Sequence, residues 1–331
     1  MKKIISLLLC AGLVMTMFTA CGAKEGVKTG LAVVTSATTE NASDGKDGNL
    51  SVDSTAVAVL VDSKGVITNC VIDVIQPKFN FNAAGEITSN TSTIFVSKKE
   101  LGDGYNMRGS SGIGKEWYEQ AEALEKYVTG KTIDQVKGIA IDEGGHPTDE
   151  DLKSSVTINI ASIIDAIEKA VNNAKDLGAK AGDKLGLGIT STAQYPQNAT
   201  AEADGAVTAY SHYGVITLNK KGKITSSIID SSQVKVTFNA QGQVTSDMTG
   251  PFQTKLELGD KYNMRGSSPI GKEWYEQSEA FSNYIKGKTV ADVTGIALEN
   301  GVATDKDLLS SVTITIGDFI TVVEKAGAVA K

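Results

Sequence analysis

The chain repeats one long segment almost unchanged. Residues Asn106–Gln120 return as Asn263–Gln277 with one difference, Gly112 in the first copy and Pro269 in the second. The copies lie about 157 residues apart, far beyond the ~20 to 50 residues of a solenoid repeat, so the chain is a tandem duplication of a whole domain. A fold for this chain therefore contains two similar units, and we expect its function to use two similar sites.

A second segment repeats downstream of the first. Asp151–Ile158 and Asp307–Ile314 share the pattern Asp-Leu-x-Ser-Ser-Val-Thr-Ile. Between the units, over Asn172–Lys184, helix-like sequence gives way to glycine and lysine, which indicates a boundary. We predict one domain over residues 30–175 and a second over 185–331, which agrees with the usual number of domains for 331 residues.

The N-terminus has the layout of a secretory signal peptide over residues 1–20. Two lysines precede an apolar run over residues 4–17, which is too short for a comfortable transmembrane helix. The small residues before Cys21 resemble a bacterial lipobox, in which that cysteine carries lipid and becomes the mature N-terminus. An incidental cysteine after an ordinary cleaved signal is the alternative. Residues 21–29 then form a tether, and we expect the chain on the outer face of the cell membrane, anchored through its lipid.

Charge and cysteine usage exclude several classes of function. The formal net charge is −7, and because nucleic-acid binding needs clustered Lys and Arg, we expect no nucleic-acid partner. Beyond the leader and Cys21 only Cys70 remains, so an intrachain disulfide framework is excluded and we interpret Cys70 as a small packed residue on a strand. The two histidines, His146 and His212, do not occupy matching positions in the copies. We therefore expect neither a metal centre nor histidine-based catalysis.

Each unit begins with strand-like sequence. Apolar runs on either side of a turn at residues 62–65 predict a hairpin over 57–75, and a second hairpin is expected over 78–96. A polar stretch, Thr38–Ser54, precedes these strands, and the second unit has a loop over Asn198–Gly205 at the corresponding place. Helices follow the strands, which favours an α+β fold in which each unit is an antiparallel sheet with helices packed on it.

Apolar spacing predicts the helices. A helix over residues 115–128 and a final helix in each copy place their apolar residues on one face. These residues are Trp117, Ala121, Leu124 and Val128 in the first helix, then Ile160, Ile163, Ile164 and Ile167 in the final helix, matched by Ile316, Phe319, Ile320 and Val323 in the second copy. Thr132 and Thr289 each begin a capping box for a short additional helix.

Each copy places a Ser-Ser-Val-Thr sequence just before its final helix. The hydroxyl residues are Ser154, Ser155 and Thr157 in the first copy and Ser310, Ser311 and Thr313 in the second. Backbone N–H groups at a helix start are unsatisfied and the helix dipole is positive there, so a hydroxyl in this place suits a phosphate. The alternative is that the threonine only helps to cap the helix.

These motifs together resemble the FMN-binding domains of Gram-positive extracellular electron-transfer lipoproteins. The resemblance covers both units and, with the lipobox, almost the entire chain. In that family a flavin transferase moves FMN from FAD onto a threonine hydroxyl, which implies two covalent FMN groups here, on Thr157 and Thr313. The commoner family motif has Gly-Ala where this chain has Ser-Val before each threonine. Asp151 and Asp307 match the Asp-x-x-Ser spacing of the lipoprotein branch.

The resemblance also indicates which other side chains meet the flavin. Tyr118 and Tyr275 lie just off the apolar helix face and are candidates for flavin contact, whereas the neighbouring tryptophans are interpreted as core anchors. Arg108 and Arg265 are candidates to pair with the FMN phosphate or with the reduced flavin, the alternative being arginines with a structural or solvated role in their loops.

The resemblance implies a carrier of electrons with no substrate turnover of its own. Its expected partners are the flavin transferase, a membrane quinone or NADH dehydrogenase system as electron donor, and external acceptors such as ferric iron or soluble flavin. A covalent tether keeps an extracellular cofactor from diffusing away, and the flavin itself supplies the redox chemistry. Two alternatives come from other classes: a non-redox solute-binding or adhesion lipoprotein, and a flavin enzyme that reduces one small molecule.

Overall fold

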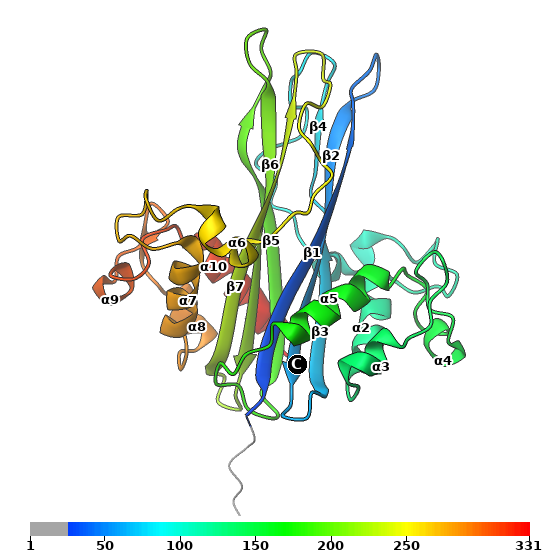
Figure 1. The fold of residues 1–331 in the computed structure, drawn as a ribbon, viewed down its shortest axis with the longest axis vertical. Helices are drawn as coiled ribbons and strands as arrows, with labels where there is room; N and C mark the ends of the chain where they lie inside the picture. Colours follow the sequence, from blue (N-terminus) through cyan, green and yellow to red (C-terminus); the bar gives the residue numbers. More distant parts are fainter. Residues whose placement is uncertain (1–25) are drawn as a thin grey trace, which may run out of the picture.

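The computed structural model describes residues 26–331, and the predicted signal peptide and the predicted lipidation site, Cys21, lie outside these residues. The described chain has four layers, in which two antiparallel sheets lie face to face and helices cover the outer face of each sheet (Figure 1). The predicted α+β class with two sheet-bearing halves is confirmed. No helix within residues 26–331 has both the length and the apolarity needed to cross a bilayer.

The first half runs from β1 to α5. Its strands are β1 (Lys28–Glu40), β2 (Gly48–Val61), β3 (Ile67–Ile75) and β4 (Lys78–Phe81), and its helices are α1 (Lys98–Leu101), η1 (Gly102–Tyr105), α2 (Trp117–Val128), α3 (Ile133–Lys137), α4 (Glu150–Lys153) and α5 (Ala161–Asn172). The strands pair in the order β1-β2-β3, and β4 pairs with the outer end of β2.

The second half repeats this order from β5 to α10. Its strands are β5 (Lys184–Gln197), β6 (Gly205–Leu218) and β7 (Ile224–Phe238) with the small pair β8 (Leu298–Glu299) and β9 (Val302–Ala303), and its helices are α6 (Lys255–Leu258), η2 (Gly259–Tyr262), α7 (Trp274–Tyr284), α8 (Val290–Thr294), α9 (Lys306–Leu309) and α10 (Gly317–Val329). The main sheet has the order β5-β6-β7.

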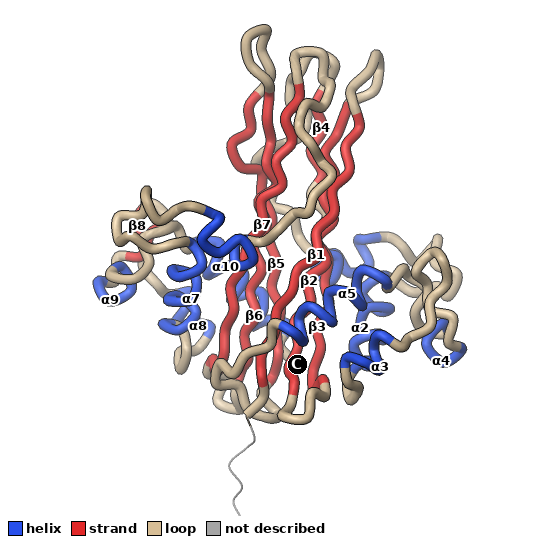
Figure 2. Tube along the Cα trace, viewed as in Figure 1, coloured by secondary structure: helices blue, strands red, loops and turns tan. Residues whose placement is uncertain are grey.

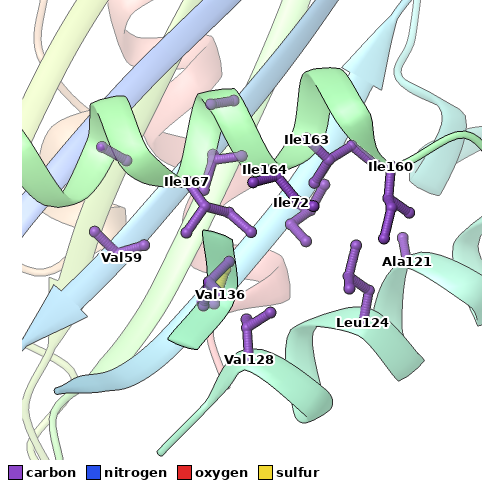
Figure 3. Packing of buried hydrophobic residues seen from close by; sticks show 14 of the residues in the cluster. Val59, Ile72, Ala121, Leu124, Val128, Val136, Ile160, Ile163, Ile164 and Ile167 are labelled. Carbon is purple, nitrogen blue, oxygen red and sulfur yellow. The ribbon is translucent and has the colours of Figure 1, made fainter. Parts of the chain in front are cut away.

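The predicted apolar helix faces form the cores between helices and sheets. In the first half, α5 packs on β1 and β2 and α2 packs on β3, and the apolar residues predicted for these helices are all buried (Figure 3). Ile72 of β3 lies among them, and Cys70 of the same strand is also buried, as predicted. The second half has the equivalent core, in which Trp274, Phe281 and Phe319 are buried. Both predicted capping boxes are present at α3 and α8.

The two sheets share an interior. Leu31 and Ala58 of the first half pack in one buried cluster with Leu187 and Tyr213 of the second. Farther along the strands, Phe81 stacks on Phe238 with ring centroids 4.1 Å apart and planes inclined by 4°. Both faces of β2 are therefore covered, one by helices and one by the other sheet, which explains the unbroken apolar run Ala56–Val61.

The structure corrects two of the expectations about the strands. The polar stretch Thr38–Ser54 belongs largely to β1 and β2, and only residues 41–47 lie between these strands. Figure 2 shows that these strand ends extend beyond the helices. No helix covers them there, so a strand can carry polar side chains. The second predicted hairpin forms only around its turn, where the backbone N–H of Asn82 donates to Glu86 at 2.8 Å and that of Thr88 donates to Asn80 at 2.9 Å. No strand continues over residues 89–96, and β4 pairs with β2 instead. The predicted loop over Asn198–Gly205 is confirmed, with β6 beginning at Gly205.

Reciprocal contacts relate the two halves. Lys169 of α5 pairs with Glu257 of α6, and Lys325 of α10 pairs with Glu100 of α1 at 2.9 Å. Each lysine also donates to a main-chain oxygen of its own sheet at 3.0 Å, that of Val33 for Lys169 and that of Ile189 for Lys325. Residue i of one half thus contacts residue j of the other and the reverse holds, which is the pattern of a two-fold interface.

Two glycines allow the last helix of each half to lie against its first strand. A Cβ atom on Gly30 would stand 2.0 Å from the carbonyl oxygen of Ala170 in α5, and one on Gly186 would stand 1.9 Å from that of Ala326 in α10. Real side chains never approach so closely, so both positions require glycine.

Candidate functional site

A fully buried glutamine connects the two repeated segments. Gln120 lies in the first turns of α2 and ends the long repeat. Its Oε1 accepts hydrogen bonds from the backbone N–H of Thr157 at 2.7 Å, from the hydroxyl of Thr157 at 3.2 Å and from the backbone N–H of Ile158 at 3.2 Å. Its Nε2 donates to the Ser111 hydroxyl and to the carbonyl of Lys115. Gln120, the last residue of the long repeated segment, therefore holds the predicted acceptor threonine in place.

The second half builds the same arrangement. Gln277 is also fully buried, and its Oε1 accepts from the backbone N–H of Thr313 at 2.8 Å, from the Thr313 hydroxyl at 3.3 Å and from the backbone N–H of Ile314 at 3.3 Å. The corresponding distances in the two halves differ by only 0.1 Å. This agreement shows that the glutamine and threonine form a unit of the fold that is present twice.

The loop before α2 is closed by a single carboxylate. Glu116 is the N-cap of α2, and it accepts hydrogen bonds from the backbone N–H groups of Met107 at 2.9 Å and Arg108 at 2.8 Å. Glu119 completes a capping box by accepting from the backbone N–H of Glu116 at 2.8 Å. The start of the helix, and with it Gln120, is held in place by the residues of the long repeat.

Thr157 lies in the short loop between α4 and α5. Val156 and Ile160 on either side are buried, while Thr157 is half-buried. The Thr157 hydroxyl donates to Gln120 Oε1, and its oxygen accepts from no donor among the described residues. Helix α5 begins four residues after Thr157, and its N-cap residue, Ile160, supplies no side-chain acceptor for the N–H groups of the first turn. A reachable hydroxyl beside a helix N-terminus is suited to a phosphoester, and these residues therefore fit the phosphate end of FMN.

The predicted serines and aspartates shape this loop. Ser154 donates to the carbonyl of Asp151 at 2.9 Å, and Ser155 donates to that of Leu152 at 3.1 Å. In the second half, Ser310 and Ser311 make the same bonds to Asp307 and Leu308. The serine hydroxyls thus close the turn at the end of α4 and α9, and the carboxylates of Asp151 and Asp307 are exposed on those helices.

The two copies differ next to the threonine. Asn159 accepts from the backbone N–H of Ala161 at 2.9 Å and donates to the carbonyl of Gly144 at 2.7 Å. Thr315 stands in the corresponding place of the second half and makes neither bond. One N–H of the first turn is therefore capped in α5 but not by the equivalent residue of α10.

The predicted arginine and tyrosine meet each other at an acidic residue. Arg108 forms ion pairs with Asp103 and Glu119 at 2.8 Å, and the Tyr118 hydroxyl lies 3.4 Å from the same oxygen of Asp103. In the second half, Arg265 pairs with Asp260 and Glu276, and Tyr275 approaches Asp260. Neither arginine makes a hydrogen bond to the threonine of its half, so the structure brings these residues together with one another and not with Thr157 or Thr313.

Each predicted core tryptophan packs near a buried lysine. The Lys98 ammonium lies 5.3 Å from the Trp117 ring centroid, and that of Lys255 lies 5.1 Å from Trp274. Burial lowers the pKa of Lys255 to about 7. The tryptophans are buried, which confirms their interpretation as core residues.

Gln120 and Gln277 were missing from the site predicted from the sequence. Both stand inside the repeated segment, but a glutamine on a helix has no chemistry that distinguishes it from a solvent-facing residue. The available signal was their identity in both copies at the last position of the repeat.

Comparison with known proteins gives one short similarity. Over 42 residues the chain is 52% identical to chlorophenol reductase of Desulfitobacterium hafniense, a stretch that covers 13% of this chain and 13% of that protein. The chain thus matches far less than two thirds of this relative's length. No protein-family model matches the chain. No solved structure matches it.

Proposed function

We propose that this protein is a lipid-anchored electron carrier with one FMN covalently bound to Thr157 and a second to Thr313. The observation that carries the proposal is the duplicated contact between a buried glutamine and a half-buried threonine hydroxyl. The short similarity to a protein named as a reductase is consistent with a redox role. The resemblance of both repeated segments to FMN-binding domains supplies the identity of the cofactor.

The attachment reaction balances without any further reactant beyond FAD. The threonine Oγ1 forms a bond to the phosphorus of the FMN part of FAD, the pyrophosphate bond breaks, AMP leaves, and the hydroxyl proton is released. A flavin transferase would catalyse this step. Once bound, FMN supplies one- and two-electron redox chemistry, and the protein supplies its position.

The residues of the chain have distinct roles in this proposal. Gln120 and Gln277 orient the threonine and fix its backbone, while the serines maintain the turn before it. The N-termini of α5 and α10 favour the negative phosphate that the reaction leaves on the threonine. Tyr118 and Arg108, with their counterparts Tyr275 and Arg265, are candidates for contact with the flavin ring at the Asp103 and Asp260 clusters.

The proposed surroundings follow from the N-terminal sequence. Lipidation of Cys21 would hold the chain at the outer face of the cell membrane, where a quinone or NADH dehydrogenase system donates electrons. Ferric iron or soluble flavin outside the cell would accept them. A non-redox solute-binding or adhesion lipoprotein is the competing function, and it requires no covalent flavin.

Co-expression with a flavin transferase tests the proposal. The denatured wild-type protein should retain flavin fluorescence in a gel, and its intact mass should rise by two FMN phosphoesters. Thr157→Ala and Thr313→Ala should each remove one, and the double variant should carry none. Thr157→Ser, which keeps a hydroxyl, is the matched control. Absence of covalent flavin in the wild type would exclude the proposed function and favour the competing one.

A further inference from the structure

A cavity of about 380 Å³ lies where the edge of the first half meets the second. Its walls come from β1 and α5 on one side and from β7, α6 and α7 on the other. Figure 1 shows β1 and β7 side by side at this edge. The cavity has an apolar wall that includes Leu31, Val33 and Leu256, and its volume is in the range that holds small organic ligands.

The inner end of this cavity carries polar groups without partners. Ser227 and Ser282 are 3% and 6% exposed, and neither hydroxyl has a hydrogen-bond partner among the described residues. Both side chains line the cavity, together with Ile229. A buried hydroxyl without a partner is unfavourable, so two of them in one cavity favour the binding of a polar group there.

The two-fold relation between the halves gives this cavity a counterpart. A related cavity of about 440 Å³ lies between α1, α2 and β3 of the first half and β5 and α10 of the second. Cys70, Ile72 and Glu125 correspond to Ser227, Ile229 and Ser282, and they do not line that cavity. The Glu125 side chain is 3% exposed and is therefore buried in the protein rather than facing that cavity.

In the first half, the protein's own carboxylate, that of Glu125, occupies the position equivalent to Ser282. Glu125 accepts from the backbone N–H of Ile72 at 2.7 Å, contacts Lys99, and lies 3.1 Å from the Lys331 ammonium. Lys175 is the counterpart of Lys331, since each exchanges two backbone hydrogen bonds with the first strand of its half. The cavity lined by Ser282 keeps this lysine, contributed by the first half as Lys175, but has Ser282 in place of the carboxylate.

We propose that the cavity between the halves binds a small organic acid with an apolar body. The ligand carboxylate takes the position that Glu125 fills in the first half, and accepts from the Ile229 N–H and from the hydroxyls of Ser227 and Ser282. Lys175 lies at the rim as the compensating charge. Leu256, which replaces Lys99, offers the ligand's body an apolar contact.

Three acidic residues line the cavity, and two of them, Glu257 and Asp230, already have partners within the protein, whereas the third, Glu279, is exposed to solvent. Glu257 is paired with Lys169. Asp230 accepts from the backbone N–H groups of Ser231 at 2.7 Å and Leu256 at 3.0 Å, so its carboxyl is already bound by the protein. Lys286 adds a further positive charge to the wall.

Benzoate is the probe that tests the site, with benzyl alcohol as its uncharged analogue. Calorimetric titration of the full-length protein should show one benzoate per chain and at least about tenfold weaker binding of the alcohol. Ser282→Glu, which places the protein's own carboxylate at the inner end, should abolish benzoate binding. Ser282→Ala should weaken it severalfold, and melting curves of both variants should report a folded protein.

Glu125→Ser provides a gain-of-binding test. It opens the equivalent place in the first half and should raise the stoichiometry from one benzoate to two. The proposal is overturned if the wild type shows no saturable binding of benzoate, if Ser282→Glu binds it as tightly as the wild type, or if the alcohol binds equally well. A stoichiometry of one in Glu125→Ser would overturn the comparison between the halves on which the proposal rests.

Discussion

Gln120 Oε1 accepts a 2.7 Å hydrogen bond from the backbone N–H of Thr157, a residue 37 positions away. Three donors converge on this one oxygen, and two of them are backbone N–H groups. Such groups are seldom left unpaired in a folded protein. The contact therefore stabilises the loop before α5 and also determines how the threonine hydroxyl is presented.

Replacement of this glutamine should reduce both stability and labelling. Gln120→Met keeps the shape but removes the acceptor, so unpaired N–H groups should lower the free energy of unfolding by about 1–3 kcal/mol. Covalent flavin on Thr157 should fall while that on Thr313 stays unchanged, as measured by mass spectrometry of the two peptides. Gln277→Met should give the converse pattern. Equal loss at both threonines would show that the glutamine has no local role.

Replacement of the arginine should leave attachment intact. Arg108 is half-exposed and bound by Asp103 and Glu119, and solvent screens such exposed ion pairs so that they add little to stability. Arg108→Gln should therefore keep the melting temperature within a few degrees and should carry wild-type covalent flavin on Thr157. A shift in the flavin's reduction potential in this variant would place the guanidinium near the ring. Loss of the covalent bond would show that the arginine serves the phosphate.

Stability should depend on pH through a buried carboxyl. Burial raises the pKa of Asp230 to about 7, against the hydrogen bonds that favour its charged form. Between about pH 4 and 7 the folded protein holds a proton that the unfolded chain has released. This contribution to stability is complete below the unfolded pKa and is lost as the pH rises through about 7.

Asp230→Asn removes that titration. Denaturant unfolding from pH 4 to pH 8 should show a steeper fall in the free energy of unfolding for the wild type than for the variant. Asp73→Asn should act in the same direction, since burial raises the pKa of Asp73 to about 6. Parallel curves for the wild type and Asp230→Asn would contradict the assignment.

A methyl group at the helix contact should be costly. In Gly186→Ala the new Cβ would stand 1.9 Å from the Ala326 carbonyl oxygen, so α10 must shift from its sheet. We expect a loss of at least about 2 kcal/mol in the free energy of unfolding, as for other overpacked interiors. Gly266→Ala, where nothing lies within 4 Å, is the control and should unfold like the wild type.

The sequence predicted the helices better than the strands. The helix cores were predictable because residues such as Leu124 and Ile163 recur at helical spacing and face one sheet. β1 was missed because its outer end carries polar residues on a strand that only half-buries them, so composition resembled a loop. Gln120 was missed because its importance comes from a contact 37 residues away, and local pattern carries no record of such contacts.

Sequence periodicity did not predict that the two sheets pack face to face. The apolar run Ala56–Val61 predicted a strand, but its sequence does not say which surfaces cover the two faces of that strand. Tyr213 and Leu187 of the other half cover one of these faces. The cavity between the halves depends on this pairing and therefore appears only in three dimensions.

The interior that the two sheets share has a consequence for folding in dilute surroundings. A polypeptide with one copy would expose the apolar face that contains Leu31 and Ala58, and would have to meet a second molecule to cover it. Covalent linkage makes this encounter intramolecular, so folding becomes independent of protein concentration. The two copies therefore meet at the same rate however dilute the protein is.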